Sequence, residues 1–350
     1  MRKDWQDLLR ATGAHFQGSQ VAHFNDPAGE RQATATKDVI CVLSHETLVT
    51  AHGPDAEHFL QAQLTNDVGE VSTKRSQLTA YLNPKGRMLG MFRLVQYGKD
   101  TFVLKTRLEI RDELLTRLQT YVLRSKVMLS AADDSMVALG VSGPGVARQL
   151  EQVFGVVPDA TDACLTAGHL TLVRVRGATV PRFEILGCCE NALDVWRRLA
   201  DATQPVGASC WAWQDILAGI PCVLPQTIAE FVPQMANLDL LGGVSFQKGC
   251  FPGQEIVARL HYLGKLKQRM ILARVESYSP VSAGAHIYSP VRANQSVGTV
   301  VDAQPGVEGD YDLLAVVQLS SYHTGELFLE SLTGPRLVLR PLPYNWDHSC

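Results

Sequence analysis

The chain has 350 residues, of which 46% are hydrophobic and 19% are charged, and its formal net charge at pH 7 is −3. These values are typical of an ordinary soluble globular protein with two or three hydrophobic cores that folds without disulfide bonds. The small negative charge excludes a global basic field for nucleic acid. No run approaches about 20 apolar residues, and residues 1–10 lack the apolar core of a secretory signal, so neither a membrane span nor a leader is predicted.

Cysteine usage indicates a reducing compartment. The cysteines form neither a CxxC pair nor the spacing of a zinc finger, so the sequence predicts no metal site. An apolar core of this size does not need disulfides. The predicted location is therefore the cytoplasm. The eight cysteines are Cys41, Cys164, Cys188, Cys189, Cys210, Cys222, Cys250 and Cys350.

The N-terminal part, residues 1–38, is predicted to be a helix and a loop. Apolar residues recur at helical spacing over residues 4–16. The polar run 17–38 contains Pro27 and Gly29, which predicts a loop or a mobile segment.

A unit of strand, Gly-Pro pair and helix occurs twice, and we infer an internal duplication. The two copies are 48–52, Gly53-Pro54 and 55–64, then 137–141, Gly143-Pro144 and 146–154. Further strands and helical patterns follow each copy, which predicts an α+β fold with helices covering largely antiparallel sheets. The predicted strands are 78–82, 88–95, 101–105, 169–175 and 182–186. The predicted helices are 110–124, 191–200 and 210–218.

Beyond residue 267 the pattern changes to short alternating strands separated by Gly, Pro and Ser. This pattern predicts a small closed β domain, a β-barrel over residues 268–350. Its predicted strands are 269–275, 298–301, 313–319 and 336–340.

The composition of residues 230–259 is the least explained by packing in a hydrophobic core. Cys250 lies in a Lys-Gly-Cys-Phe-Pro-Gly turn, where glycines at 249 and 253 are expected to permit backbone conformations that a side chain forbids. Residues 254–260 predict a helix whose N-terminus, together with Lys248, would lower the pKa of the thiol and make it more reactive. The alternative is that Cys250 is a small buried apolar residue and the glycines merely shape a turn.

The runs 231–239 and 242–259 resemble the signature of the folate-binding YgfZ-type proteins, which are relatives of the glycine-cleavage T-protein, an aminomethyltransferase. Residues 59–68, 81–89 and 118–129 also match the family, and the resemblance extends from about Thr47 to about Pro341. The family plan implies two α+β modules that bear a folate site, at about 39–132 and 133–267, and a C-terminal β-barrel.

The resemblance implies tetrahydrofolate as the cofactor and suggests which residues hold it. Glu184, in Arg-Phe-Glu, stands where the aminomethyltransferases carry the Glu that pairs with the pterin, and Phe183 precedes it. Arg124, Gln254 and Glu255 complete the predicted folate-binding set. A folate site needs a carboxylate, apolar walls and cations at its mouth. The alternatives are that Glu184 faces outward from an alternating strand and that Arg124 is a solvated cation.

Two departures from the transferase separate this sequence from a one-carbon enzyme. The run 85–91 has no carboxylate where those enzymes place the Asp that positions the amine. Likewise, 215–219 lacks the Arg that would bind the folate tail. Folate recognition is therefore expected to be arranged differently.

The leading hypothesis is an accessory protein that binds tetrahydrofolate and supports iron–sulfur cluster assembly or repair, with Cys250 and Lys248 carrying the chemistry. By resemblance, its partners are iron–sulfur enzymes, including radical enzymes that modify tRNA. The alternative is a folate-dependent aminomethyltransferase.

A third possibility is a module that binds nucleic acid directly. It rests on a basic cluster with His261 and Tyr262 among it, which is expected instead to be a solvated linker. Direct nucleic-acid binding is therefore not predicted, and the chain is expected to be a monomer without membrane contacts. The cluster consists of Arg259, Lys265, Lys267, Arg269 and Arg274.

Overall fold

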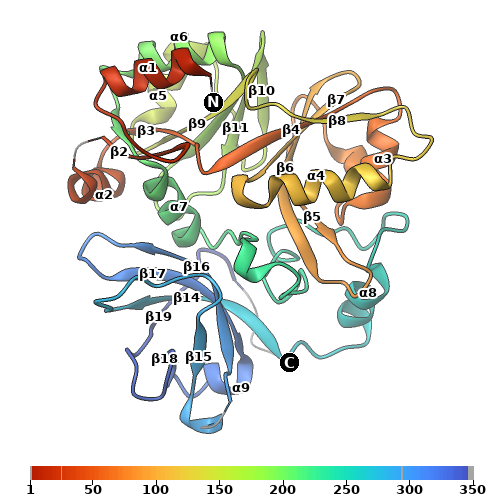
Figure 1. The fold of residues 1–350 in the computed structure, drawn as a ribbon, viewed down its shortest axis with the longest axis vertical. Coiled ribbons are helices and arrows are strands. Elements are labelled where there is room, and N and C mark those ends of the chain that lie inside the picture. The colour runs from red at the N-terminus through yellow and green to blue at the C-terminus, as the bar shows by residue number, and fades with distance from the viewer. Residues whose placement is uncertain (1, 25, 293–294, 346–350) are drawn as a thin grey trace. The chain divides into compact units, whose positions relative to one another are not determined.

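The computed structural model describes residues 2–24, 26–292 and 295–345 (Figure 1). The chain passes more than once between two compact units, which are described separately. The first unit comprises Met1–Leu60, Val68–Gln77 and Phe92–Ala212, and the second comprises Gln61–Asp67, Leu78–Met91 and Trp213–Cys350. Every described helix is too short or too polar to cross a membrane.

Groups of strands, mostly two or three, alternate with helices along most of the described chain. The helices are α1 (Lys3–Ala11), α2 (Pro27–Thr36), α3 (Ala56–Gln63), α4 (Arg111–Thr120), α5 (Val146–Phe154), α6 (Cys189–Leu199), α7 (Ala208–Leu217), α8 (Gln254–Tyr262) and α9 (Leu319–Tyr322). The strands up to α6 are β1 (His15–Gln17), β2 (Gln20–His23), β3 (Val39–Val42), β4 (Glu46–His52), β5 (Gln77–Leu82), β6 (Met88–Gly98), β7 (Thr101–Arg107), β8 (Met128–Ala131), β9 (Met136–Ser142), β10 (Cys164–Ala167), β11 (Leu170–Val175) and β12 (Arg182–Cys188). The later strands are β13 (Gln204–Val206), β14 (Gln268–Val275), β15 (His286–Tyr288), β16 (Gly298–Pro305), β17 (Tyr311–Gln318), β18 (Phe328–Leu329) and β19 (Val338–Arg340).

The topology of two sheets supports the inferred duplication. One sheet has the order β5-β6-β7-β4-β8, and the other has the order β10-β11-β12-β9-β3-β13. The runs β5-β6-β7-β4 and β10-β11-β12-β9 are equivalent, because a helix follows both β4 and β9 and another follows both β7 and β12.

The paired glycines of the two copies also adopt the same backbone conformation. Gly53 has φ +139° and Gly143 has φ +142°. A Cβ at Gly53 would lie 2.2 Å from the carbonyl oxygen of Lys126, and one at Gly143 would lie 2.4 Å from Oδ1 of Asp38. Each turn therefore needs glycine both for its φ and for the close approach of a neighbouring segment.

The hydrophobic core of the first unit has two layers, one on each face of the second sheet. On one face, Phe183 and Ile185 of β12 pack with buried residues of α1, α5 and α6. On the other face, Leu186 of β12 lies in one cluster with Val95 of β6 and Val103 of β7. Successive strand residues point to opposite faces, so this second layer is where the two sheets pack on each other.

The C-terminal part of the second unit is a curled sheet of order β18-β15-β16-β17-β14-β19 (Figure 1). Its two edges approach through the segment before β19, because Leu337 N donates to Leu327 O at 2.8 Å and Leu329 N donates to Pro335 O at 2.9 Å. The predicted α+β class with a C-terminal β-barrel is confirmed in this form. The predicted domain boundaries at 38, 132 and 267 stay predictions.

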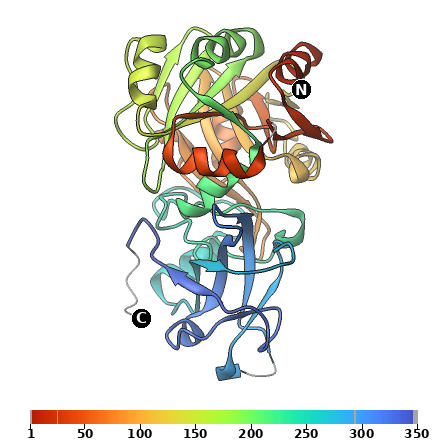
Figure 2. The same cartoon turned by 90° about the vertical axis from the view of Figure 1, so that its left-hand side faces the viewer.

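The prediction of a loop over 17–38 is wrong. β2 pairs with β1, and α2 occupies residues 27–36, with the Asp26 side chain accepting from Ala28 N at 3.1 Å. Figure 2 shows α2 as the orange-red helix that faces the viewer. The polar composition of this segment suggested an exposed loop, but Glu30 is buried. Its carboxylate accepts hydrogen bonds from Phe24 N at 2.5 Å and from Gly207 N at 2.8 Å. The predicted N-terminal helix is correct in type but ends at Ala11.

Candidate functional site

The side chain of Lys248 anchors the signature loop in the second unit. It is buried, and its Nζ donates to the backbone oxygens of Gln61 at 2.7 Å, Leu64 at 2.7 Å and Asn66 at 2.8 Å. These carbonyls lie at the C-terminal end of α3, where backbone acceptors lack intrahelical partners and the helix dipole favours a cation. Burial lowers the pKa of Lys248 to about 8.

The residues just before Lys248 bind the same segment through hydrogen bonds to the backbone. Thr65 Oγ1 donates to Gly243 O at 2.8 Å, and Asn66 Nδ2 donates to Gly242 O at 2.7 Å. Ser245 N donates to Thr65 O at 3.0 Å. The family-like patches 59–68 and 242–250 are therefore held against each other by hydrogen bonds between their backbone and side-chain groups.

The residues that follow Cys250 pack on the turn between β5 and β6. Gly253 has φ +76°, and a Cβ there would lie 2.6 Å from Asn83 O, so glycine is required where α8 begins against this turn. The Asn83 side chain accepts from the N–H groups of Lys85 at 2.9 Å and Arg87 at 3.1 Å, which closes the turn. The turn within the family-like patch 81–89 is thus held by the signature itself.

Cys250 is exposed at the tip of this loop. Lys248 on one side and Phe251 on the other are buried, so the loop is fixed on both sides of the thiol. The alternative that Cys250 is a small buried residue is wrong. The expectation that Gly249 needs glycine is also wrong, because a Cβ there would meet nothing within 4 Å and its φ is not positive.

The other described cysteines are shielded by comparison. Cys41, Cys164, Cys189 and Cys210 are buried, and Cys188 and Cys222 are half-buried, while Cys350 lies outside the described residues. Burial raises the pKa of Cys164 and of Cys210 to about 11, so neither forms a thiolate readily at neutral pH. Among the described thiols, Cys250 is the one that solvent reaches freely.

Glu184 lies in the first unit, within a charged layer between the two packed sheets. It is 3% exposed, so the alternative of an outward-facing carboxylate is wrong. Lys105 Nζ lies 3.1 Å from Glu184 Oε1, and Arg93 Nε lies 3.7 Å from Oε2. Oε2 has no hydrogen-bond partner among the described residues.

The same layer holds further charges. Lys105 also pairs with Glu46, and Arg93 pairs with Asp162 at 2.6 Å. Glu184, Lys105 and Arg93 each share a strand face with residues of the inter-sheet core, which fixes them between the sheets.

His45 is buried beside this charged layer. Neither of its ring nitrogens has a hydrogen-bond partner in the described part of the chain. Burial and the nearby cations Arg107, Lys105 and Arg182 hold the pKa of His45 well below its usual range. The imidazole is therefore neutral at physiological pH.

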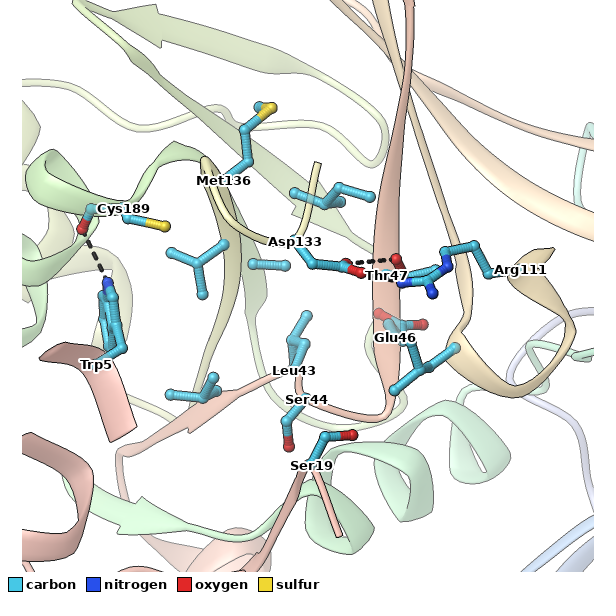
Figure 3. Close-up of a pocket in the computed structure, with 15 residues that line it drawn as sticks. Trp5, Ser19, Leu43, Ser44, Glu46, Thr47, Arg111, Asp133, Met136 and Cys189 are labelled. Atoms are coloured by element: carbon cyan, nitrogen blue, oxygen red, sulfur yellow. Dashed lines mark hydrogen bonds and ion pairs between the residues drawn. The ribbon is translucent and has the colours of Figure 1, made fainter. Parts of the chain in front are cut away.

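A pocket of the first unit, about 240 Å³ in volume, was not predicted from the sequence. Figure 3 shows Asp133, Thr47 and Arg111 at one end, where Thr47 Oγ1 donates to Asp133 at 2.6 Å and Arg111 pairs with Asp133. At the other end, Trp5 Nε1 donates to the backbone oxygen of Cys189 at 3.0 Å. The lining residues come from segments far apart in the sequence, chiefly 42–48 and 136–138, so no single local motif signals the pocket.

Comparisons with known proteins place the chain in a family. The family model described as the GCVT N-terminal domain matches residues 11–214. The tRNA-modifying protein YgfZ of Cronobacter sakazakii is 32% identical over 88% of this chain and 93% of its own length. That of Pectobacterium atrosepticum is 31% identical over 91% of this chain and 94% of its own length. The chain belongs to the YgfZ branch of the GcvT family.

A solved structure shares the fold of this YgfZ-type chain. It is the glycine cleavage system aminomethyltransferase T from Bartonella henselae, which is 17% identical, covers 97% of this chain and 96% of its own, and has a TM-score of 0.78. The predicted family and fold are thus confirmed.

The predicted site residues of this YgfZ-type protein fall into separate groups. Cys250, Lys248, Gln254 and Glu255 lie along one loop and the first turn of α8 in the second unit. Glu184 and Phe183 share β12 in the first unit, but they point to opposite faces.

Phe183 and Arg124 are therefore not brought together with the Glu184 carboxylate. Phe183 belongs to the helix-covered core, with the Arg174 guanidinium 5.7 Å from its ring centroid. Arg124 is exposed in the turn after α4, where it lines a cavity of about 760 Å³ with Asp55 and His58. The roles of these residues stay predictions.

Proposed function

We propose that the protein binds tetrahydrofolate and supports iron–sulfur cluster assembly or repair and iron–sulfur-dependent tRNA modification, with Cys250 as its reactive thiol. The observation that carries this proposal is the exposed Cys250 on a loop fixed by the buried Lys248 and Phe251. A side chain that served only packing would not stand at the tip of a loop anchored on both sides. The names of the YgfZ relatives support the link to tRNA, a cytoplasmic substrate.

Tetrahydrofolate binding is proposed at the charged layer of the first unit. A pterin edge offers N–H donors, and Glu184 Oε2 is a buried acceptor with no hydrogen-bond partner among the described residues. Lys105 and Arg93 compensate the buried charge of Glu184. Phe183 supports β12 from the opposite face rather than forming a wall of the site.

The thiol chemistry belongs to the second unit. An exposed thiolate serves as a nucleophile, a redox thiol or a ligand of an iron–sulfur cluster, and all three uses require an accessible sulfur. The turn between β5 and β6 has no carboxylate in residues 85–91, so the group that orients the donor amine in aminomethyl transfer is missing. This absence favours the accessory role over the transferase.

Replacing Cys250 with serine tests the proposal. Serine keeps the size of the side chain while removing the soft sulfur, so Cys250→Ser should retain its melting temperature and its affinity for tetrahydrofolate. It should fail to restore tRNA thiomethylation in a cell that lacks its own YgfZ protein. Cys222→Ser is the matched control and should restore it. Full complementation by Cys250→Ser would remove the thiol from the mechanism.

A further inference from the structure

A group of aromatic rings, with His261 and Tyr262 exposed and Phe246 half-buried, lies at the C-terminal end of α8 in the second unit. The rings of Phe246 and His261 stack with centroids 3.7 Å apart and an interplanar angle of 12°. The ring of Tyr262 stands edge-on to His261, with centroids 4.7 Å apart at 79°. Tyr262 is 64% exposed and the adjoining Leu263 is 86% exposed. We call Phe246, His261 and Tyr262 the aromatic platform.

The basic cluster around the platform divides into paired and unpaired cations. Arg269 pairs with Asp239 at 2.7 Å, and Arg274 pairs with Asp310 at 2.8 Å. The cations that remain are all exposed, and in the described part of the chain they have no ion-pair partner. They are Arg259, Lys265 and Lys267.

The charge around the platform is locally positive, although the whole chain is weakly negative. No acidic residue occurs between Glu255 and Glu276. Exposed aromatic rings beside cations without partners are the combination with which proteins hold single-stranded nucleic acid, because bases stack on rings and phosphates contact cations.

We propose that the aromatic platform and these three cations bind single-stranded RNA. The choice of RNA over DNA rests on the proposed function in tRNA modification. α8 begins four residues after Cys250, and its nine residues span about 13 Å, so an RNA held on the platform lies near the loop that carries the thiol. This inference reverses the expectation that the basic cluster is only a solvated linker, whereas the net charge of −3 excluded only a global basic field.

A membrane surface fits the same residues less well. Leu263 is an exposed apolar side chain here, but the two exposed platform rings are the imidazole of His261 and the phenol of Tyr262. The apolar ring of Phe246 is half-buried. A helix that lies in a membrane interface presents a broad apolar face. In α8 the apolar Val257 is buried against the protein instead.

Fluorescence anisotropy with the full chain and a short labelled single-stranded RNA tests the proposal. One stacked base contributes about 1–3 kcal/mol, so Tyr262→Ala should weaken binding about 5- to 160-fold. Tyr262→Phe keeps the ring and should bind nearly as the original chain does. Tyr278, 113% exposed in the same unit, supplies the control Tyr278→Ala, which should bind RNA unchanged.

Salt dependence tests the cations separately. Three phosphate contacts predict a slope of about −2 for log affinity against log salt, and the double variant Lys265→Ala, Lys267→Ala should reduce its magnitude by about 1.4. Arg292→Ala removes an exposed cation elsewhere in the unit and should leave the slope unchanged. An equally large reduction of the slope in Arg292→Ala would overturn the assignment of RNA binding to this surface.

Two further measurements separate this inference from the proposed function. Equal RNA affinity for the original chain and Tyr262→Ala overturns the inference. So does binding to anionic phosphatidylglycerol vesicles that depends on Tyr262 when no RNA binding is found. Calorimetry with tetrahydrofolate should give the same affinity for Tyr262→Ala as for the original chain. If RNA binding is absent while the Cys250→Ser result stands, the proposed function survives and the RNA surface does not.

Discussion

The Glu184 layer and the Cys250 loop use burial in opposite ways. In the layer, the functional candidate is itself buried, and its charge is balanced by Lys105 and Arg93. In the loop, the anchors Lys248 and Phe251 are buried, while the candidate thiol is exposed. Burying a charge is costly unless the charge is paired. A change in the layer is therefore expected to lower the free energy of unfolding, whereas a change at the exposed Cys250 is expected to leave it nearly unchanged.

The largest expected difference between the regions concerns thiol reactivity. Cys250 should react with iodoacetamide at least about 100-fold faster than buried Cys164 or Cys210, because a buried thiol reacts only after local opening that costs several kcal/mol. Competitive alkylation of the native protein followed by mass spectrometry measures all three sites at once. Half-buried Cys188 and Cys222 provide the internal comparison. Labelling of Cys250 no faster than theirs would refute the activated thiol.

The second difference concerns stability. Lys105→Met leaves Glu46 and Glu184 in the layer without the ammonium that they share, and removing one partner of a buried ion pair costs about 3–5 kcal/mol. Urea unfolding of the variant measures the loss. Arg117→Met breaks the exposed pair with Glu113 and should cost no more than about 0.5 kcal/mol. Similar losses in both variants would mean that the layer is not a tightly coupled buried network.

The third prediction concerns folate. Glu184→Gln keeps the shape of the side chain but removes its charge, and hydrogen bonds to charged groups are worth about 1.5–3 kcal/mol. Tetrahydrofolate should therefore bind about 13- to 160-fold more weakly in calorimetry. Glu30→Gln changes a buried carboxylate outside the layer and is the control for a general loss of structure. Unchanged affinity in Glu184→Gln would move the folate site away from this residue.

Local sequence patterns predicted most of the fold because hydrophobic periodicity and turn residues mark most helices, strands and turns. The helix 146–154 matches α5, and the Gly-Pro pairs marked both copies of the repeated unit. The sequence misassigned α2 because polarity normally indicates a surface loop, and one of the two hydrogen bonds that the buried Glu30 accepts comes from Gly207, which is distant in the chain. Short strands such as β13 were missed because they contain too few residues for a period.

The candidate site was predicted unevenly for a similar reason. Its exposed thiol lies within one continuous motif, which the sequence displays directly. The partners of Glu184 come from β6 and β7, so only the folded chain reveals that the carboxylate is already paired. Likewise, the motif suggested that Lys248 acts on Cys250, but the acceptors of its amine are carbonyls contributed by another segment.

The last expected effect is the pH dependence that Lys248 contributes to the free energy of unfolding. Burial lowers its pKa from an ordinary value of 10.5 to about 8 in the folded protein. Below pH 8 both states hold the proton, so Lys248 adds no pH dependence. Between pH 8 and 10.5 the folded state loses the proton first, the unfolded state binds more protons, and the free energy of unfolding should rise with pH.

Lys248→Met isolates this contribution, because the difference in unfolding free energy between the original chain and the variant cancels other titrating groups. The difference should grow in favour of the original chain from pH 8 to 10.5 and then level off, as measured by urea unfolding in steps of pH. Alkylation of Cys250 in the same variant should stay within about 2-fold if Lys248 only anchors the loop, since its amine donates to three carbonyls rather than to the thiol. A difference that falls with pH would mean that those carbonyls hold the ammonium charged, and a larger loss of labelling would restore Lys248 as the residue that activates Cys250.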